Sequence, residues 1–236
     1  MIKLLRSFTG AVFVFVLMVN VACENKPNAD NVSKQAENED QAISQQNNDD
    51  ARVIVFFGNS LTAGYGLEPE EAFPAIIQTY IDSLGYNYKV VNAGVSGETT
   101  ASGNSRVDWI LKQPLDVFVL ELGGNDGLRG IDPAETKINL QSIIDKVKEA
   151  KPEATIVLAG MQVPPNMGAE YSDAFRDLYP DLAETNNLPL IEFLLEGVGG
   201  DPELNLPDGI HPTAEGHQIV ADNVWNTLKD NIKTNR

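Results

Sequence analysis

The sequence predicts an α/β fold in which helices cover both faces of a parallel β-sheet. Five short runs of β-branched, aliphatic and aromatic residues recur within residues 51–236, and helical patterns lie between them. The runs do not strictly alternate with polar residues, which is typical of strands that are buried on both faces. Strands that alternate with helices favour parallel pairing through right-handed crossovers.

The five predicted strands span residues 52–57, 88–92, 116–120, 155–159 and 189–193. The predicted helices span residues 70–84, 133–150 and 212–232. The first helix ends before Gly85, a residue type that favours the left-handed position after a helix. The second begins with Asp132 as its cap and Pro133 in its first turn. Because ligands bind at the carboxyl ends of strands in such sheets, functional residues are expected directly after the strand runs.

The composition excludes several classes of function. The chain has 236 residues with 17 Lys and Arg against 34 Asp and Glu, which gives a net charge of −17. An acidic chain repels phosphate backbones, so nucleic acid is not an expected partner. Two His and one Cys are too few for the usual zinc sites. The sequence also lacks the G-x-x-x-x-G-K-[ST] motif of P-loop nucleotide enzymes.

Residues 1–22 have the pattern of a secretory signal. Lys3 and Arg6 are followed by an uncharged apolar run at residues 11–19 and by the small residue Ala22. The apolar run is shorter than the roughly 20 residues that a membrane-spanning helix needs. We therefore expect export to the periplasm or the cell surface.

Cys23 follows the signal directly, and the segment resembles a bacterial lipoprotein signal, although Asn20 stands where that family usually has Leu. The resemblance implies that Cys23 is lipidated and anchors the chain to a membrane. The alternative is an ordinary cleaved signal with an incidental cysteine. Residues 23–50 are polar and acidic with few large apolar side chains, which predicts a disordered tether to the domain at residues 51–236.

The loops of the predicted sheet contain residues that suit nucleophilic catalysis. Ser60 lies on a glycine-flanked turn after the first strand, where its hydroxyl can be exposed. Asp208 and His211 lie three residues apart before the last helix, which supplies a base and a carboxylate to orient it. Each residue alone could simply belong to a turn or cap. By contrast, His217 lies inside the last helix and is interpreted as a packing or surface residue.

Two further loops reach the same edge of the predicted sheet. Gly94 follows the second strand, where the lack of a Cβ lets a backbone N–H approach a ligand. Asn125 follows the third strand and offers an amide donor. Taken singly, both are turn signals. Their convergence with Ser60, Asp208 and His211 on one sheet edge favours a common site.

Four stretches of the chain, residues 57–67, 92–100, 121–130 and 208–212, together resemble the SGNH hydrolases, also called GDSL esterases. The closest branch is that of bacterial thioesterase I, lysophospholipase L1 and arylesterase. The resemblance implies a flavodoxin-like three-layer α/β/α fold with a five-stranded parallel sheet of order 2-1-3-4-5.

The resemblance also implies roles for individual residues. Ser60 is the nucleophile, His211 the base and Asp208 the group that orients it. The oxyanion hole comprises the backbone N–H groups of Ser60 and Gly94 and the side chain of Asn125. The loop after the fourth strand resembles the branch's substrate loop and gives the candidate substrate-binding residues Gln162, Val163, Pro164, Pro165 and Met167.

One residue departs from the family pattern. Asn59 precedes the nucleophile where the family has Asp, which removes a negative charge beside Ser60. We expect activity to survive, because Asn keeps a short side chain that hydrogen-bonds locally.

The expected activity is hydrolysis of an acyl ester or thioester through an acyl-enzyme, on a small-molecule or lipid substrate. No metal or organic cofactor is expected. Two alternatives remain open, namely a carbohydrate O-acetylesterase and a lipid-anchored protein that binds ligands on the same scaffold without catalysis.

Overall fold

A parallel sheet of order β2-β1-β3-β4-β5 forms the centre of the molecule in the computed structural model, which describes residues 51–233. The strands are β1 (Arg52–Gly58), β2 (Tyr88–Gly94), β3 (Val117–Glu121), β4 (Thr155–Ala159) and β5 (Leu190–Ile191). This confirms the predicted sheet and its order. The signal segment, Cys23 and the tether lie outside the described residues.

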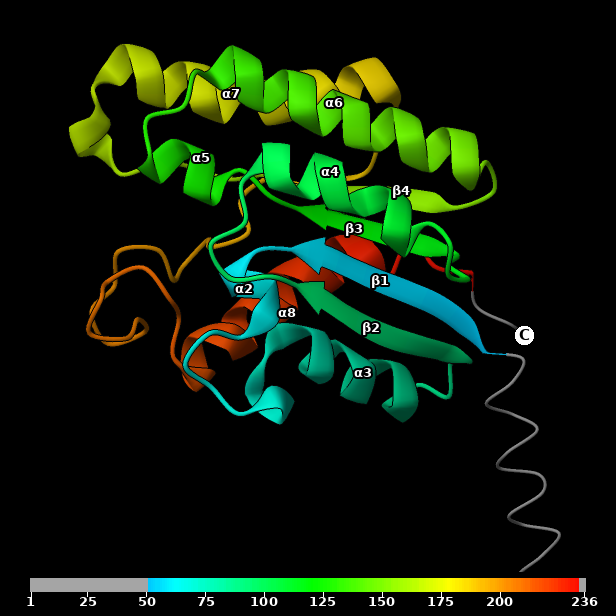
Figure 1. Cartoon of the computed structure of the whole chain (residues 1–236). Helices are drawn as coiled ribbons and strands as arrows, with labels where there is room; N and C mark the ends of the chain where they lie inside the picture. The colour runs from blue at the N-terminus through cyan, green and yellow to red at the C-terminus, as the bar shows by residue number, and fades with distance from the viewer. Residues whose placement is uncertain (1–50, 234–236) are drawn as a thin grey trace, which may run out of the picture. The chain divides into compact units, whose positions relative to one another are not determined.

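Helices cover both faces of this sheet, as predicted (Figure 1). The helices α4, α6 and α7 lie on one face, and α3 and α8 lie on the other. Their bounds are α3 Phe73–Ser83, α4 Thr100–Ile110, α6 Pro133–Ala150, α7 Ala169–Asn186 and α8 Ala214–Leu228. Shorter elements are α2 Ser60–Ala63, η1 Pro69–Glu71, α5 Gly124–Leu128 and η2 Pro165–Met167. None of the helices within residues 51–233 is long and apolar enough to cross a bilayer.

The predicted start of α6 and the predicted left-handed glycine after α3 are confirmed. The Asp132 side chain accepts a hydrogen bond from Ala134 N at 2.8 Å, and Pro133 is the first residue of α6. At the end of α3, Gly85 adopts the left-handed conformation with φ of 67°. Its N–H donates to Asp82 O at 3.0 Å, which satisfies one of the last carbonyls of the helix.

Several elements differ from the prediction. The helices α4 and α7 were not predicted, since α4 is rich in residues with low helix propensity and α7 contains Pro180. The helix α3 begins at Phe73 because residues 69–71 form the separate turn η1. The last strand is also shorter than predicted, with only Leu190 and Ile191 in the sheet.

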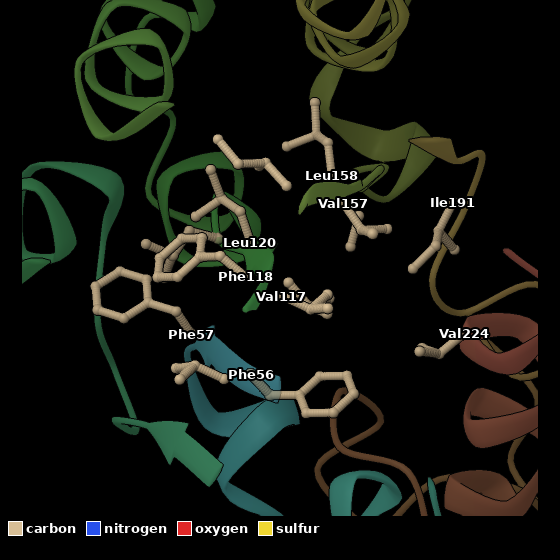
Figure 2. Packing of buried hydrophobic residues seen from close by; sticks show 14 of the residues in the cluster. Phe56, Phe57, Val117, Phe118, Leu120, Val157, Leu158, Ile191 and Val224 are labelled. Carbon is tan, nitrogen blue, oxygen red and sulfur yellow. The ribbon is translucent and has the colours of Figure 1, made fainter. Parts of the chain in front are cut away.

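The core is built on β1 and β3, two strands that each have a neighbour on both sides. Every residue of β3 and every residue of β1 from Ile54 onward is buried. Phe56 and Phe57 point to opposite faces of the sheet, as successive residues of a strand must (Figure 2). Phe56 contacts Phe73 of α3 edge-on at 5.3 Å, and Phe57 packs against Phe118 of β3 at 5.3 Å. The central strands therefore anchor both helical layers.

His217 packs inside the fold rather than on the surface. Its ring is 1% exposed, and its Nδ1 accepts a hydrogen bond from Phe73 N at 3.1 Å, at the start of α3. Burial, and secondarily the charge of His211, lowers the pKa of His217 from 6.5 to about 4. His217 is therefore neutral in the native protein at neutral pH, and its contribution to stability depends on pH.

We predict that His217 makes the protein sensitive to mild acid. Below pH 6.5 the unfolded chain binds a proton at this position that the native state does not bind until about pH 4. The free energy of unfolding should then fall by about 2.5 kcal/mol between pH 7 and 4.5 relative to a His217→Gln variant, which keeps an acceptor for Phe73 N. Urea unfolding of both proteins at pH 7 and 4.5 measures this difference, in which the contributions of carboxyl groups cancel. Parallel pH dependences would contradict it.

Candidate active site

Three strands end at the same level and so bring their following loops together. Gly58 at the end of β1 pairs with Gly94 of β2 and with Glu121 of β3. Ser60 and Asn125 follow β1 and β3 within a few residues. The carboxyl edge of the sheet therefore collects the polar groups that the sequence placed after the strands.

Ser60 is the first residue of α2 and is 8% exposed. The backbone N–H groups that follow it are satisfied: Leu61 N donates to Asn59 Oδ1 at 2.9 Å, and Ala63 N donates to Asn59 O at 3.0 Å. Thr62 N donates to Glu121 Oε2 at 3.3 Å. Within the described part of the chain, the Ser60 N–H is the one of these four without an acceptor, so it is available to an oxyanion.

Asp208, His211 and Ser60 form a continuous hydrogen-bonded chain. His211 Nε2 lies 2.9 Å from Ser60 Oγ, and His211 Nδ1 lies 2.7 Å from Asp208 Oδ2. The Tyr65 ring packs on the imidazole, with the ring centroids 4.5 Å apart. The structure therefore brings together the three predicted residues in the arrangement of a nucleophile, a base and an orienting carboxylate.

The loop that carries Asp208 and His211 is held in a turn. Leu206 N donates to His211 O at 2.7 Å, and Asp208 Oδ1 accepts from Ile210 N at 2.9 Å and from His211 N at 3.0 Å. The hydrogen bond from the His211 side chain, followed by these backbone bonds, lowers the pKa of Asp208 to about 2. Asp208 is therefore ionised at any physiological pH and can stabilise a positive charge on the imidazole.

Of the two other predicted oxyanion donors, the structure supports one. Asn125 lines the pocket beside Ser60, and its Nδ2 donates to Glu98 O at 3.0 Å, which fixes the orientation of the amide. The prediction for Gly94 is wrong, because its N–H donates to Asn92 Oδ1 at 3.0 Å. A Cβ at Gly94 would overlap the backbone of Ala63, so this glycine serves the close packing of β2 against α2.

Glu121 is a buried acidic residue of the site that the sequence analysis missed. Its side chain is 0% exposed and accepts four hydrogen bonds from Asn59 and Thr62, the residues on either side of Ser60 and Leu61. Burial raises the pKa of Glu121 to about 7, although the hydrogen bonds oppose this shift. The signal in the sequence was an acidic residue at the end of an otherwise apolar strand.

A pocket of about 490 Å³ opens beside Ser60 and His211. Its walls are mainly apolar and come from α2, from α5 and from the loops after β4 and β5. The apolar lining residues are Leu61, Leu128, Met161, Val163, Pro164, Phe193, Leu195 and Ile210. A pocket of this size and lining suits an apolar substituent next to the reacting group.

The predicted substrate loop contributes to this pocket in part. Gln162, Val163 and Pro164 line it. Met167 is not among the lining residues, because η2 turns the chain and places the Met167 methyl near Gly130. The Pro165 side chain lies outside the part of the chain that is described.

Residues 56–219 match the model of the GDSL-like Lipase/Acylhydrolase family. The chain is 39% identical to Esterase TesA of Pseudomonas aeruginosa over 180 residues, which cover 76% of this chain and 89% of that protein. It is also 39% identical to Thioesterase 1/protease 1/lysophospholipase L1 of Escherichia coli K12 over 173 residues, or 73% of this chain and 81% of that protein.

A solved structure supports the same relationship. The crystal structure of TesA superposes on this chain with a TM-score of 0.74 at 38% identity. The superposition covers 77% of this chain and 100% of that chain. The match to the family model extends from β1 into α8, so it includes the loops at the carboxyl edge of the sheet.

The geometry predicts that Ser60 is an activated nucleophile. A fluorophosphonate should label the protein at Ser60 with one adduct, because His211 removes the hydroxyl proton as the oxygen attacks phosphorus. Ser60→Ala should abolish labelling, whereas Ser105→Ala, which removes an exposed serine of α4, should leave it unchanged. Intact-protein mass spectrometry measures the adduct. Equal labelling of wild type and Ser60→Ala would exclude Ser60 as the nucleophile.

Proposed function

The chain belongs to the GDSL-like lipase/acylhydrolase family, and we propose that it hydrolyses carboxylic esters and thioesters of apolar acyl groups through an acyl-enzyme on Ser60. The observation that carries this proposal is the hydrogen-bonded chain from Asp208 through His211 to Ser60 beside an apolar pocket. The relatives named esterase and thioesterase support the same reaction class.

The mechanism follows from the distances at the site. His211 Nε2, 2.9 Å from Ser60 Oγ, accepts the hydroxyl proton as Oγ attacks the acyl carbonyl. Asp208 keeps the proton of Nδ1 in place and stabilises the imidazolium. His211 then donates its proton to the leaving alcohol or thiol as the acyl-enzyme forms. A water molecule attacks this ester with His211 again as the base, and Ser60 regains its proton when the acid leaves.

The negative oxygen of the tetrahedral intermediate needs fixed donors. Ser60 N–H and Asn125 Nδ2 are two of them, and loss of one such donor typically costs about 10²–10³ in rate. Gly97 replaces Gly94 as the candidate for the third donor. Gly97 adopts φ of 80°, its N–H has no acceptor among residues 51–233, and the next carbonyl, that of Glu98, is bonded to Asn125.

The pocket favours an acyl chain over an acetyl group on a sugar. A carbohydrate O-acetylesterase needs a shallow polar site, whereas the surface of this pocket is mainly apolar. Leu128 and Ile210 are 43% exposed each, and they extend the apolar wall to the surface. A chain of several methylenes can therefore bury apolar area here that an acetyl group cannot.

We predict a preference for medium acyl chains. The kcat/KM for p-nitrophenyl octanoate should exceed that for the acetate by at least about 10-fold, since each buried methylene contributes up to about 0.8 kcal/mol. Leu128→Ser should reduce this preference, and Leu84→Ser, at an exposed leucine beyond the end of α3, should not. Octanoyl-CoA, a lysophospholipid and acetylated xylan complete the panel. Faster hydrolysis of acetate or xylan acetyl groups would contradict the assignment.

The proposal includes export and anchoring of the enzyme to a membrane at Cys23. Its support is the sequence alone, in which a positive start, a short apolar run and Ala22 precede the chain's single cysteine. Residues 24–50 would then act as the tether between the anchor and the catalytic domain. A substrate that partitions into the membrane would be close to the pocket in this arrangement.

We predict that cells expressing the full chain incorporate radiolabelled palmitate into it. Cys23→Ala should abolish the label and release the protein from the membrane fraction, while Ser60→Ala should keep both. Autoradiography of the immunoprecipitated protein measures the incorporation. A wild-type chain that carries no label would leave the ordinary cleaved signal as the correct interpretation.

A further inference from the structure

Glu121 is a fully buried carboxylate at the site, and the reaction described above does not use it. We propose that Glu121 is a positioning residue for the nucleophile, which holds Ser60 toward His211 by fixing Asn59 before it and Thr62 after it. This inference rests on the proposed function, because it assigns Ser60 as the group to be held.

The hydrogen bonds of Glu121 reach both sides of Ser60. Oε1 accepts from Asn59 Nδ2 at 2.7 Å. Oε2 accepts from Asn59 N at 3.1 Å, from Thr62 N at 3.3 Å and from Thr62 Oγ1 at 2.8 Å. A Cβ at Gly58 would overlap both Thr62 Oγ1 and Oε2, so the carboxylate fits because position 58 is glycine. The first turn of α2 is thereby bound to the end of β3.

Glu121 also determines which way the Asn59 side chain faces. Because Asn59 Nδ2 donates to Glu121, Oδ1 faces α2 and accepts from Leu61 N at 2.9 Å, with Ser60 Oγ at 3.4 Å. The opposite orientation would set an oxygen against the carboxylate and an N–H group against Leu61 N–H. The hydrogen bonds therefore allow only one orientation, and it caps the helix that begins at Ser60.

Because residue 59 is Asn rather than Asp, residues 59 and 121 do not need to share a proton. With Asp there, as in the family pattern, two buried carboxyl groups would face each other, and one of them would have to hold a proton. The amide of Asn59 donates at every pH. Tyr179 of α7 also interacts with the charge of Glu121, but burial raises the Tyr179 pKa well above its usual value, so Tyr179 is neutral in the relevant range.

A cycle of variants at positions 59 and 121 tests the proposal with an ester substrate of measurable kcat and KM. In Glu121→Gln, the introduced amide would meet Asn59 Nδ2 donor to donor. Asn59 must then turn, and Leu61 N–H and Ser60 lose Oδ1. We expect kcat to fall about 10–100-fold with KM changed less than about 2-fold.

The double variant Asn59→Asp/Glu121→Gln should restore kcat to within about 3-fold of wild type. It exchanges the two side chains' roles: the new amide at 121 donates to the new carboxylate at 59, whose other oxygen still accepts from Leu61 N. The remaining side-chain oxygen at position 121 still accepts from the backbone N–H of residue 59 and from Thr62. A residue that only filled space would give no such rescue.

The single variant Asn59→Asp supplies a pH readout. Its two facing carboxyl groups should share a proton at low pH and lose it as the pH rises, so kcat should show an alkaline decrease that wild type and the double variant lack. Any limb caused by His211 is common to all the proteins. An unchanged pH profile in this variant would count against the proposal.

Controls separate this inference from folding and from the proposed function. Asp116→Asn, at a carboxylate that accepts from Val53 N at 2.8 Å at the other end of β1, should leave kcat unchanged. If Glu121→Gln does not fold by circular dichroism, Thr62→Val removes only the Oγ1 bond and should lower kcat about 3–10-fold. A kcat within about 2-fold of wild type in Glu121→Gln, or in Thr62→Val where that variant replaces it, overturns the inference.

Fluorophosphonate labelling of the wild type shows which conclusion has failed. A labelled, active wild type with no rescue in the double variant overturns the role of Glu121 alone. A wild type that is neither labelled nor active overturns the proposed function, and the role of Glu121 with it.

Discussion

The pairing of β1 with a strand on each side, ending at Gly58, is the constraint on which the site depends. Gly58 lies opposite Gly94 on one side and opposite Glu121 on the other, so three strands stop together. The lack of a Cβ at Gly58 lets α2 fold against the end of β3. Ser60 therefore directly follows an interior strand of the sheet rather than lying on a free loop, and the position of its hydroxyl depends on a buried part of the molecule.

Two carboxyl groups near Ser60 have their pKa values moved in opposite directions, and their surroundings explain why. Asp208 is partly open to solvent and accepts bonds from His211 and two backbone N–H groups, which lowers its pKa to about 2. Glu121 accepts four hydrogen bonds but is completely buried, and burial prevails, so its pKa rises to about 7. Asp208 thus stays ionised and can stabilise a positive charge on the imidazole, whereas Glu121 depends on its hydrogen-bond donors to remain charged.

Much of this site could be predicted because its residues carry local signals. Ser60 follows an apolar run and Asp208 and His211 share one turn, so short segments suffice to identify them. Gly94 was assigned wrongly because a sequence shows that a backbone can approach closely but not where its N–H points; here it points to Asn92.

The helices α4 and α7 are not predicted because tertiary packing, rather than the helix propensity of their residues, stabilises them. The position of Glu121 at the end of an apolar strand marks it as unusual, but only the register between β1 and β3 shows that its carboxylate lies beside Asn59.

The two long walls of the pocket differ in how closely they are tied to catalysis. The wall after β4, at residues 161–164, contributes lining residues but none of the reacting groups. The wall after β5 continues into the turn that holds Asp208 and His211, and Asn205 anchors that turn by donating to Val198 O at 2.7 Å. Changes of shape in the first wall can therefore alter the acyl group that fits without moving the base. In the second wall, a change that accommodates a different substrate also shifts the support of His211, so specificity and rate are coupled there.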